Sequence, residues 1–366
     1  MLKYLFFNHL SEMERIKVGL VGANRGSSYG HIFKAHPRTQ VTAICDINLE
    51  RGREVAKELN IKESSIFTDY DRFIDRADID IVFIGTPMPF HAEQSIKALE
   101  RDKHVLSEVT AATSIDECEE LFKVARRSKA KYMMAENCCY YHYIREWKSI
   151  IEKAVIGELY YMEAEYLHEI RNLLYNKSTG EIYWRMKRPP LHYCSHSLGP
   201  LLMFLKDDYV VRATGSGKRS DIIPNLGPGS INMQVGLFET KKGVTIKLLR
   251  SSVYAGPYQL NYVVYGTKGF LERKSEENGR IYVEGQDEVP RNVKWSIEEA
   301  DAPEEALKGG HGTSEYYLVR DFIDSIDSDK QPPIDIVKAL EITVPGIIAH
   351  EAVMNGGVWL EVPHFE

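Results

Sequence analysis

The first part of the chain alternates short apolar runs with amphipathic segments. Apolar runs of strand length fall at residues 17–21, 41–45, 79–84, 103–106 and 131–135. Segments with helical character separate them, at 49–59, 70–74, 91–99 and 115–128. Strands that alternate with helices at these lengths predict an α/β fold with a doubly wound parallel sheet.

The pattern changes after residue 137. An amphipathic helix is predicted at 144–156, and strand-like alternation follows at 159–168, 210–215, 231–240, 244–252 and 258–266. Glycine and lysine turns join these runs, which predicts an α+β domain with a large, mostly antiparallel open sheet. Helices at 314–326 and 334–355 are expected to brace both domains, and the acidic, turn-rich stretch 276–307 is interpreted as a surface loop.

The length of 366 residues exceeds one ordinary core, so two domains are expected. The predicted division is an N-terminal extension at 1–14, a nucleotide-binding domain at 15–137, and a substrate-binding and oligomerisation domain at 138–366.

Composition narrows the class of protein. The net charge of −7 argues against a nucleic acid or an anionic membrane as the main partner, and no apolar run approaches the roughly 20 residues of a spanning helix. The N-terminal stretch lacks the features of a signal peptide. Five cysteines without CxxC spacing indicate reduced thiols, so a cytoplasmic location is expected.

The stretch from Lys17 to Asp46 reads as strand, glycine turn, helix, strand and acid. Such a turn lets a pyrophosphate approach the amide groups at a helix N-terminus, and the acid can accept both ribose hydroxyls of an adenosine. The acid would repel a 2′-phosphate, which favours NAD as the cofactor. The candidate cofactor-binding residues here are Gly22, Asn24, Arg25, Gly26 and Asp46. Because Asn24 replaces the middle glycine of a GxGxxG motif, a merely structural turn is the alternative.

Further cofactor contacts are expected where the parallel strands end, because ligands bind at that edge of a doubly wound sheet. The candidates are Thr86, Pro87, His91, Glu108 and Asn137.

The segment TPMPFHAEQSIKALERDKHVLSE resembles the Gfo/Idh/MocA oxidoreductases, named after glucose–fructose oxidoreductase, inositol dehydrogenase and a rhizopine-catabolism protein. The resemblance covers the chain after its N-terminal extension and implies an N-terminal Rossmann domain with NAD. In that family a Glu-Lys-Pro lysine assists proton transfer, but Val109 and Thr110 stand in the lysine and proline positions here. This departure puts an ordinary alcohol dehydrogenase mechanism in doubt.

Three further segments carry chemistry: ENCCY, which begins at Glu136, EYLHEIR and PLHYCSHSLGP. A helix starting near Pro189 would place His192, Tyr193 and His196 on one face. Ordinary members of the superfamily have an Asp–x–x–x–His pair here; His196 matches its histidine and His192 replaces its acid.

Both departures resemble one branch, the NAD-dependent glycoside hydrolases related to α-N-acetylgalactosaminidase. The branch implies oxidation at sugar carbon 3, elimination of the glycosidic group, addition of water and reduction with the same cofactor. The implied catalytic residues are His196, Tyr193 and His168. The implied substrate-binding residues are Glu136, Tyr166, Trp184, Arg185 and His192. The loop 309–312 resembles a family segment near the active site more weakly.

Alternatives remain open at this point. His168 could be a core histidine, His192 could face solvent, and His168, His192 and His196 could hold zinc, although no HExxH motif supports a metal. The function could be a plain sugar or cyclitol dehydrogenase that releases NADH, or a non-catalytic NAD or sugar sensor. The family resemblance also implies a carbohydrate or glycoside as the partner and a homodimer or homotetramer formed through the open sheet.

Overall fold

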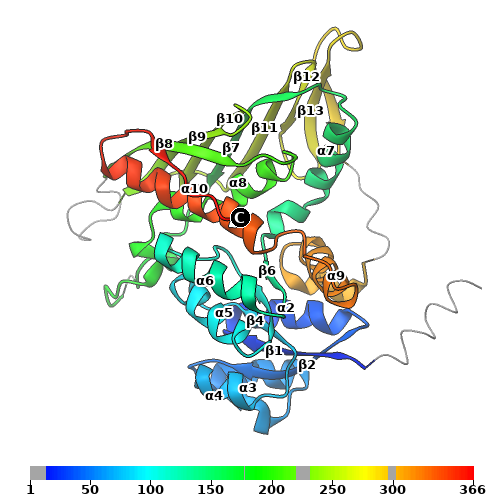
Figure 1. Ribbon diagram of the computed structural model, residues 1–366, viewed down its shortest axis with the longest axis vertical. Helices are drawn as coiled ribbons and strands as arrows, with labels where there is room; N and C mark the ends of the chain where they lie inside the picture. Colours follow the sequence, from blue (N-terminus) through cyan, green and yellow to red (C-terminus); the bar gives the residue numbers. More distant parts are fainter. Residues whose placement is uncertain (1–13, 177, 220–230, 296–301) are drawn as a thin grey trace, which may run out of the picture. The chain divides into compact units, whose positions relative to one another are not determined.

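The computed structural model describes residues 14–176, 178–219, 231–295 and 302–366, so nearly all of the predicted N-terminal extension lies outside the described residues. The chain divides into two compact units (Figure 1). Unit 1 comprises Met1–Asn137 and Glu299–Ala339, and unit 2 comprises Cys138–Glu298 and Leu340–Glu366. Residues 299–339, which the sequence analysis assigned to the second domain, thus group with the first unit.

Unit 1 contains the predicted doubly wound sheet. Six parallel strands run in the order β3-β2-β1-β4-β5-β6. Their bounds are β1 (Ile16–Val21), β2 (Thr39–Cys45), β3 (Ile66–Phe67), β4 (Ile81–Ile84), β5 (His104–Ser107) and β6 (Tyr132–Met134). The central strand β4 is buried along its whole length, as a sheet covered on both faces requires. The prediction of a parallel α/β sheet is confirmed.

Helices cover the sheet of unit 1. They are α2 (Ala23–Ala35), α3 (Leu49–Leu59), α4 (Tyr70–Arg76), α5 (His91–Leu99), α6 (Ile115–Arg127) and α9 (Ser314–Asp327). Side chains cap the N-termini of two of these helices. At α3 Asn48 accepts a hydrogen bond from Arg51 N, and at α6 Ser114 accepts one from Glu117 N. The late helix α9 and the short helix η7 (Glu304–Gly309) pack against α2, and Figure 1 shows α9 beside it.

Unit 2 is built on a nine-stranded sheet in the order β14-β13-β12-β11-β7-β10-β9-β8-β15. Only the β7–β10 pair is parallel among the pairs of this sheet in the described residues. The strands are β7 (Leu159–Leu167), β8 (Val210–Arg219), β9 (Ile231–Thr240), β10 (Thr245–Ser251), β11 (Gln259–Gly266), β12 (Gly269–Arg273), β13 (Asn278–Val283), β14 (Arg291–Lys294) and β15 (Leu360–Glu361). The prediction of a large, mostly antiparallel sheet is confirmed.

The prediction that 276–307 is a surface loop is wrong for much of its length. Strands β13 and β14 and the helix η7 lie within it. Ile281 and Val283 point inward from β13, and the strand gains its ladder from β12. The short, glycine-containing pattern hid this strand, because a single Ile–x–Val alternation carries little signal.

The helices of unit 2 are α7 (His142–Glu152), α8 (Ser195–Leu202) and α10 (Ile336–Met354), whose first four residues belong to unit 1. The short helices η3 (Asn137–Tyr140), η4 (Arg171–Leu173), η5 (Trp184–Lys187) and η6 (Pro190–Tyr193) lie between the larger elements. In the described residues no helix is long and apolar enough to cross a membrane.

The single helix predicted from Pro189 through His196 is wrong. The chain forms η6, interrupts at Cys194 and starts again as α8. The amide of Leu191 donates a hydrogen bond to Gln234 Oε1 at 3.1 Å. A side chain of the sheet thus satisfies an amide that would have no acceptor in the first turn of a helix. A side chain at Gly346 of α10 would come within 2.2 Å of Leu191 O, which shows how closely the two segments pack.

Candidate functional site

The turn between β1 and α2 provides the cradle expected for a dinucleotide. Gly22 has a φ of 87°, and a Cβ there would lie 2.7 Å from Gly85 O, so only glycine fits. Helix α2 starts immediately after it, at Ala23, with the amides of Asn24 and Arg25 in its first turn. The first amides of a helix have no acceptor within the helix and favour an anion.

Gly26 and Gly30 are not part of the turn, contrary to the predicted glycine turn. Both lie within α2, where Gly26 packs on Leu20 and a Cβ at Gly30 would come within 2.3 Å of Leu59. Their small size lets the helix approach the sheet and α3. The anion cradle therefore rests on Gly22 and the first turn of α2.

Asp46 follows β2 and is held by the backbone. Its Oδ2 accepts a hydrogen bond from Ala23 N at 2.6 Å, and its Oδ1 accepts one from Asn48 N at 2.8 Å. A carboxylate has about four acceptor positions, so two of them stay available for hydroxyl groups. The half-buried side chain is thus oriented for a ribose, and the residues of unit 1 fit the adenosine half of NAD.

Arg25 and Glu108, two predicted cofactor ligands, are paired with each other. Arg25 Nε lies 2.6 Å from Glu108 Oε1, and its Nη2 lies 2.5 Å from Glu315 Oε1. Glu315 is fully buried and also meets His311 Nδ1 at 2.8 Å, which links the predicted loop 309–312 to the cradle. One guanidinium thus bridges two carboxylates within unit 1.

Other predicted cofactor residues lie where strands β4 and β6 end. Thr86 Oγ1 donates to Gln94 Oε1 at 2.6 Å, and Pro87 follows it before the short helix η2 (Met88–Phe90). Asn137 is buried at the end of unit 1. His91 is only 1% exposed, and its two ring nitrogens lie 2.8 Å from Thr86 O and 2.9 Å from Thr110 O. Its ring therefore fastens the strand ends and has no free edge for a ligand.

Unit 2 brings the three predicted catalytic residues together with the predicted substrate-binding residue Tyr166. Tyr258, which was not predicted, completes an aromatic cluster that we define as Tyr166, His168, Tyr193, His196 and Tyr258. The His196 ring contacts the Tyr193 ring edge-on at 4.9 Å and the Tyr166 ring at 5.4 Å between centroids. The Tyr258 ring packs on Tyr166 and His168 and is about half exposed. The cluster is thus reachable from solvent on one side.

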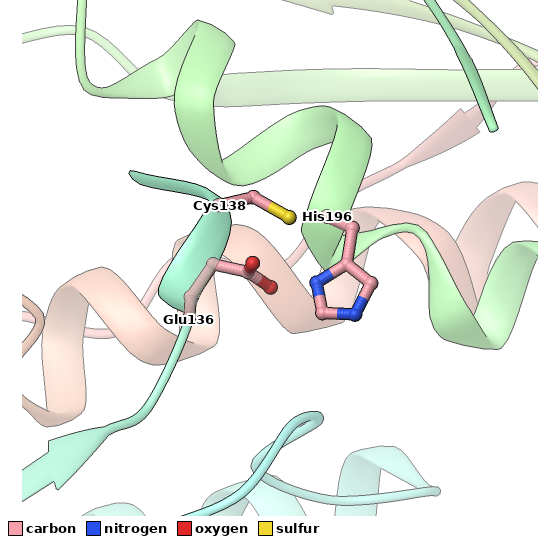
Figure 2. A group of neighbouring side chains, drawn as sticks. All are labelled: Glu136, Cys138 and His196. Atoms are coloured by element: carbon pink, nitrogen blue, oxygen red, sulfur yellow. The ribbon is translucent and has the colours of Figure 1, made fainter. Parts of the chain in front are cut away.

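Strand β7, the β11 side of the sheet and helix α8 position this cluster. Tyr166 and His168 come from the end of β7, and His196 sits in the first turn of α8, where Tyr262 OH donates a hydrogen bond to its carbonyl oxygen. Figure 2 shows the His196 ring and the Cys138 side chain near each other, with Glu136 two residues before Cys138 in the chain.

Tyr166 and His168 form a directed hydrogen bond. Tyr166 OH and His168 Nδ1 are 2.9 Å apart. Burial raises the pKa of Tyr166 well above its usual value, so the phenol keeps its proton and is the donor. Burial, followed by the charges of Arg250, His196 and Arg188, lowers the pKa of His168 to about 4. His168 is therefore neutral at pH 7, and its Nδ1 is the acceptor.

Two arginines that the sequence analysis missed border the cluster. The Arg250 guanidinium lies 4.3 Å from the Tyr166 ring centroid and 5.5 Å from that of Tyr193. The Arg188 guanidinium lies 4.0 Å from the Tyr193 ring centroid. Arg250 occupies an inward position of β10 in line with Ile246 and Leu248, and a charged residue at an inward strand position was the signal that could have found it.

Trp184 and Arg185, both from η5, lie beside this group. The Arg185 guanidinium is 4.5 Å from the Trp184 ring centroid, and Arg188 approaches the same ring at 5.6 Å. Trp184 thus connects Arg185 to Arg188, and all three can border a polar ligand.

His192 does not share a face with Tyr193 and His196. Its half-buried ring packs edge-on against His350 at 5.1 Å, and Gln234 Nε2 donates to His350 Nδ1 at 3.0 Å. Burial, with the neighbouring His350 and Arg188, lowers the pKa of His192 to about 3. The break at Cys194 turns the ring away, so the helical spacing misplaced it.

The zinc set weighed from the sequence is not assembled. Cys138 Sγ and a His196 ring nitrogen lie within 4.8 Å of each other, but neither His168 nor His192 joins a ligand group with His196 in the described residues. We interpret His168 through its hydrogen bond to Tyr166, and both His168 and His196 through their ring contacts.

Comparison with known proteins defines the class. Residues 16–136 match the model described as the oxidoreductase family, NAD-binding Rossmann fold, of Gfo/Idh/MocA proteins. This match identifies residues 16–136 as an NAD-binding Rossmann domain, with NAD as the cofactor. Residues 205–366 match the model described as glycosyl hydrolase 109, C-terminal domain.

Individual relatives agree with both matches. The chain is 26% identical over 392 residues to a glycosyl hydrolase family 109 protein from Solibacter usitatus, covering 96% of this chain and 88% of the relative. It is 25% identical over 389 residues to an α-N-acetylgalactosaminidase from Bacteroides fragilis, covering 96% and 92%. The structure of a levoglucosan dehydrogenase in complex with NADH and L-sorbose has the same fold, with a TM-score of 0.83, 18% identity and coverage of 96% of this chain and all of that one.

Proposed function

We propose that this chain is an NAD-dependent enzyme that acts on a carbohydrate by hydride transfer at a hydroxyl-bearing carbon, as the redox step of glycoside cleavage. The observation that carries the proposal is the aromatic cluster of unit 2, in which a neutral His168 accepts from Tyr166 and His196 contacts both tyrosines. The α-N-acetylgalactosaminidase similarity of the whole chain supports the glycosidase form of the reaction.

When bound, NAD would supply the hydride acceptor for the oxidation and the hydride donor for the reduction. The chain's own residues have proton work to do. In the proposed cycle His196 takes the proton of the hydroxyl group at carbon 3 as that carbon becomes a ketone. The ketone acidifies the hydrogen on carbon 2, and Tyr193 or His168 accepts that proton. The bond between carbon 1 and the glycosidic oxygen then breaks, and the leaving group receives a proton.

The second half restores the sugar. Water adds at carbon 1, a proton returns to carbon 2, and reduction of the ketone regenerates the hydroxyl group, so the net reaction is hydrolysis without net oxidation. Tyr166 orients His168 through the hydrogen bond between them. A well-placed acid or base contributes about 10²–10⁴-fold to such steps. Trp184, Arg185 and Glu136 are the proposed substrate-binding residues.

One departure from ordinary dehydrogenases favours the glycosidase form. Val109 replaces the lysine that resembled enzymes use near the nicotinamide, and it is buried with no group that can move a proton. We propose that the aromatic cluster of unit 2 takes over the proton transfer. A plain dehydrogenase with dissociable NADH is the second candidate, because the structural similarity to a sugar dehydrogenase extends over the whole chain.

A panel of nitrophenyl glycosides, with NADH absorbance followed in parallel, separates the candidates. The proposal expects release of nitrophenol with no net NADH and with NAD needed only in catalytic amounts. NADH formed in proportion to sugar would instead support the plain dehydrogenase. No turnover of any glycoside or free sugar by NAD-loaded protein would contradict both.

We also propose self-association through the outer face of the nine-stranded sheet. That face carries Glu163, Glu165 and Asn261 around a cavity of about 290 Å³. Light scattering at several protein concentrations tests this, and a monomer at all of them would contradict it.

A further inference from the structure

The arginines next to the aromatic cluster are unusual for buried cations. Arg250 is 1% exposed and Arg188 is 8% exposed. In the described part of the chain neither guanidinium has a carboxylate partner, and the charge of Arg250 disfavours the charged form of Arg188. Buried charges are normally paired, because removing an unpaired charge from water is costly.

The hydrogen-bonding capacity of these two arginines is also incompletely used. Arg250 donates from Nη1 to Tyr166 O at 3.1 Å and to Ser251 O, and from Nε to Tyr193 O at 3.3 Å. Arg250 Nη2 and Arg188 Nε have no partner within the described residues. A guanidinium donates through five N–H groups in a planar fork that matches a carboxylate or a phosphate.

Both arginines converge on one ring. Arg188 lies 4.0 Å and Arg250 5.5 Å from the Tyr193 ring centroid. Stacking on an aromatic face stabilises each cation only by about 0.5–2 kcal/mol, less than the cost of its burial. Burial, followed by Arg250, lowers the pKa of Arg188 to about 9, so the group still carries its charge at pH 7.

The cavity beside Arg188 supplies no acid. Its volume is about 200 Å³, and its lining includes Lys187 and Arg219 and no acidic residue. The described residues that line this cavity therefore supply no negative charge to Arg188.

We propose that Arg188 and Arg250 bind an anionic substituent of the substrate, a carboxylate, phosphate or sulfate group on the sugar, beside Tyr193. This inference rests on the proposed function for the carbohydrate nature of the ligand and names its charge class. A neutral sugar would leave both buried cations uncompensated, whereas one anion between them supplies the charge and the acceptors that both lack.

Equilibrium binding to the full chain loaded with NAD tests the inference without requiring turnover. Calorimetry compares glucose and galactose with glucuronate and galacturonate, and with the corresponding 6-phosphates and 6-sulfates. We expect at least one anionic sugar to bind about tenfold or more tightly than its neutral counterpart, the value of one charged hydrogen bond. The series with carboxylate, phosphate and sulfate identifies the anion. Equal affinity for neutral and anionic sugars throughout would overturn the inference.

Arg188→Gln is the matched variant. The Arg188 side chain donates no hydrogen bond within the described structure, so its replacement removes no such bond that the fold needs. The variant should lose the preference for the anionic sugar. Arg291→Gln, at a half-exposed arginine that pairs with Asp287 in the same unit, should keep it. A preference that survives in Arg188→Gln would overturn the inference. Equal loss of neutral and anionic sugar binding would also do so, because it would assign Arg188 to holding Tyr193.

A ligand change keeps the test independent of folding. The methyl ester of the preferred uronic acid removes the charge with little change of shape, and wild-type protein should bind it about as weakly as the neutral sugar. Unchanged affinity for the ester would overturn the inference. Because these are binding measurements, they stand apart from the glycoside panel: anion binding without glycoside cleavage refutes the proposed reaction and keeps the anion site, and cleavage of neutral glycosides alone does the reverse.

Discussion

The two units differ in how their arginines are paired. In unit 1, the half-buried Arg25 is held between the carboxylates of Glu108 and Glu315 at hydrogen-bond distance, so this guanidinium has acid partners on two sides. In unit 2, Arg188 and Arg250 stack on tyrosine rings without an acid beside them in the described structure.

The contrast separates a finished framework from a site that awaits a ligand. In unit 1 the ion pairs of Arg25 hold α2, α9 and the end of β5 together. The donors that remain at the turn are backbone amides. In unit 2, two arginines without an acid partner in the described residues lie beside an aromatic cluster that contains the neutral His168. Changes in unit 1 should therefore act on stability and NAD binding, and changes in unit 2 on turnover and substrate binding.

The largest expected effect is that of His196→Ala. Removal of the imidazole should lower glycoside turnover by about 10²–10⁴-fold, because it removes the proposed proton acceptor. NAD affinity, measured by fluorescence of bound NADH, should not change. His364→Ala, at a histidine that stacks on Tyr209 elsewhere in unit 2, is the control and should keep full turnover. Full activity of His196→Ala would contradict a catalytic role for the aromatic cluster.

Arg25→Gln should have the next largest effect, on stability. It leaves Glu315 buried without its guanidinium partner, which we expect to cost about 2–4 kcal/mol of unfolding free energy. Urea denaturation of the apoprotein measures the loss, and Arg51→Gln, at an exposed ion pair on α3, should cost less than about 1 kcal/mol. Equal losses in the two variants would break the contrast between the units.

Acid should weaken unit 2 through its buried histidines. The folded pKa values of His168 and His192, about 4 and about 3, lie below the unfolded value of 6.5. Between those limits the unfolded chain binds more protons, so the unfolding free energy falls as pH drops from about 6.5 toward 4. Each histidine should contribute roughly 1–3 kcal/mol. Urea midpoints measured across this range should fall less steeply in His168→Gln, and an unchanged slope would contradict the assignment of a neutral His168.

The smallest effect should have the opposite sign. Arg188→Met replaces an unpaired buried cation by a side chain of similar length, and we expect a gain of about 1–2 kcal/mol in unfolding free energy with loss of anion binding. Thermal unfolding measures the gain. Arg291→Met should change stability by less than about 0.5 kcal/mol. A marked destabilisation by Arg188→Met would show that the cation has a structural partner.

Much of the fold could be predicted because the signals are local. Apolar runs and helical spacing fixed the sheet of unit 1, and the bounds of α3 (Leu49–Leu59), α5 (His91–Leu99) and β9 (Ile231–Thr240) agree with the sequence interpretation. Strands β13 and β14 escaped, because their ladder partners, not their own sequence, specify them.

The site was predictable only in part, for a related reason. Spacing brought Tyr193 and His196 together, but it could not foresee that Gln234, distant in sequence, takes the Leu191 amide and that His192 turns to His350. Arg188 lay in a basic run that resembles a solvated surface, and Arg250 resembled an ordinary strand residue. The proposed role of these two arginines depends on the absence of an acid partner in the described residues, and only the folded chain shows this absence.

The most direct test of the central claim follows a proton. Turnover of the preferred glycoside in heavy water should place deuterium on carbon 2 of the released sugar, with no net NADH, because the hydrogen there leaves and returns from solvent. Nuclear magnetic resonance of the product measures this. A released sugar that keeps its original hydrogen at carbon 2 would contradict the account, because it would show cleavage without the elimination that the cluster of unit 2 is proposed to carry out.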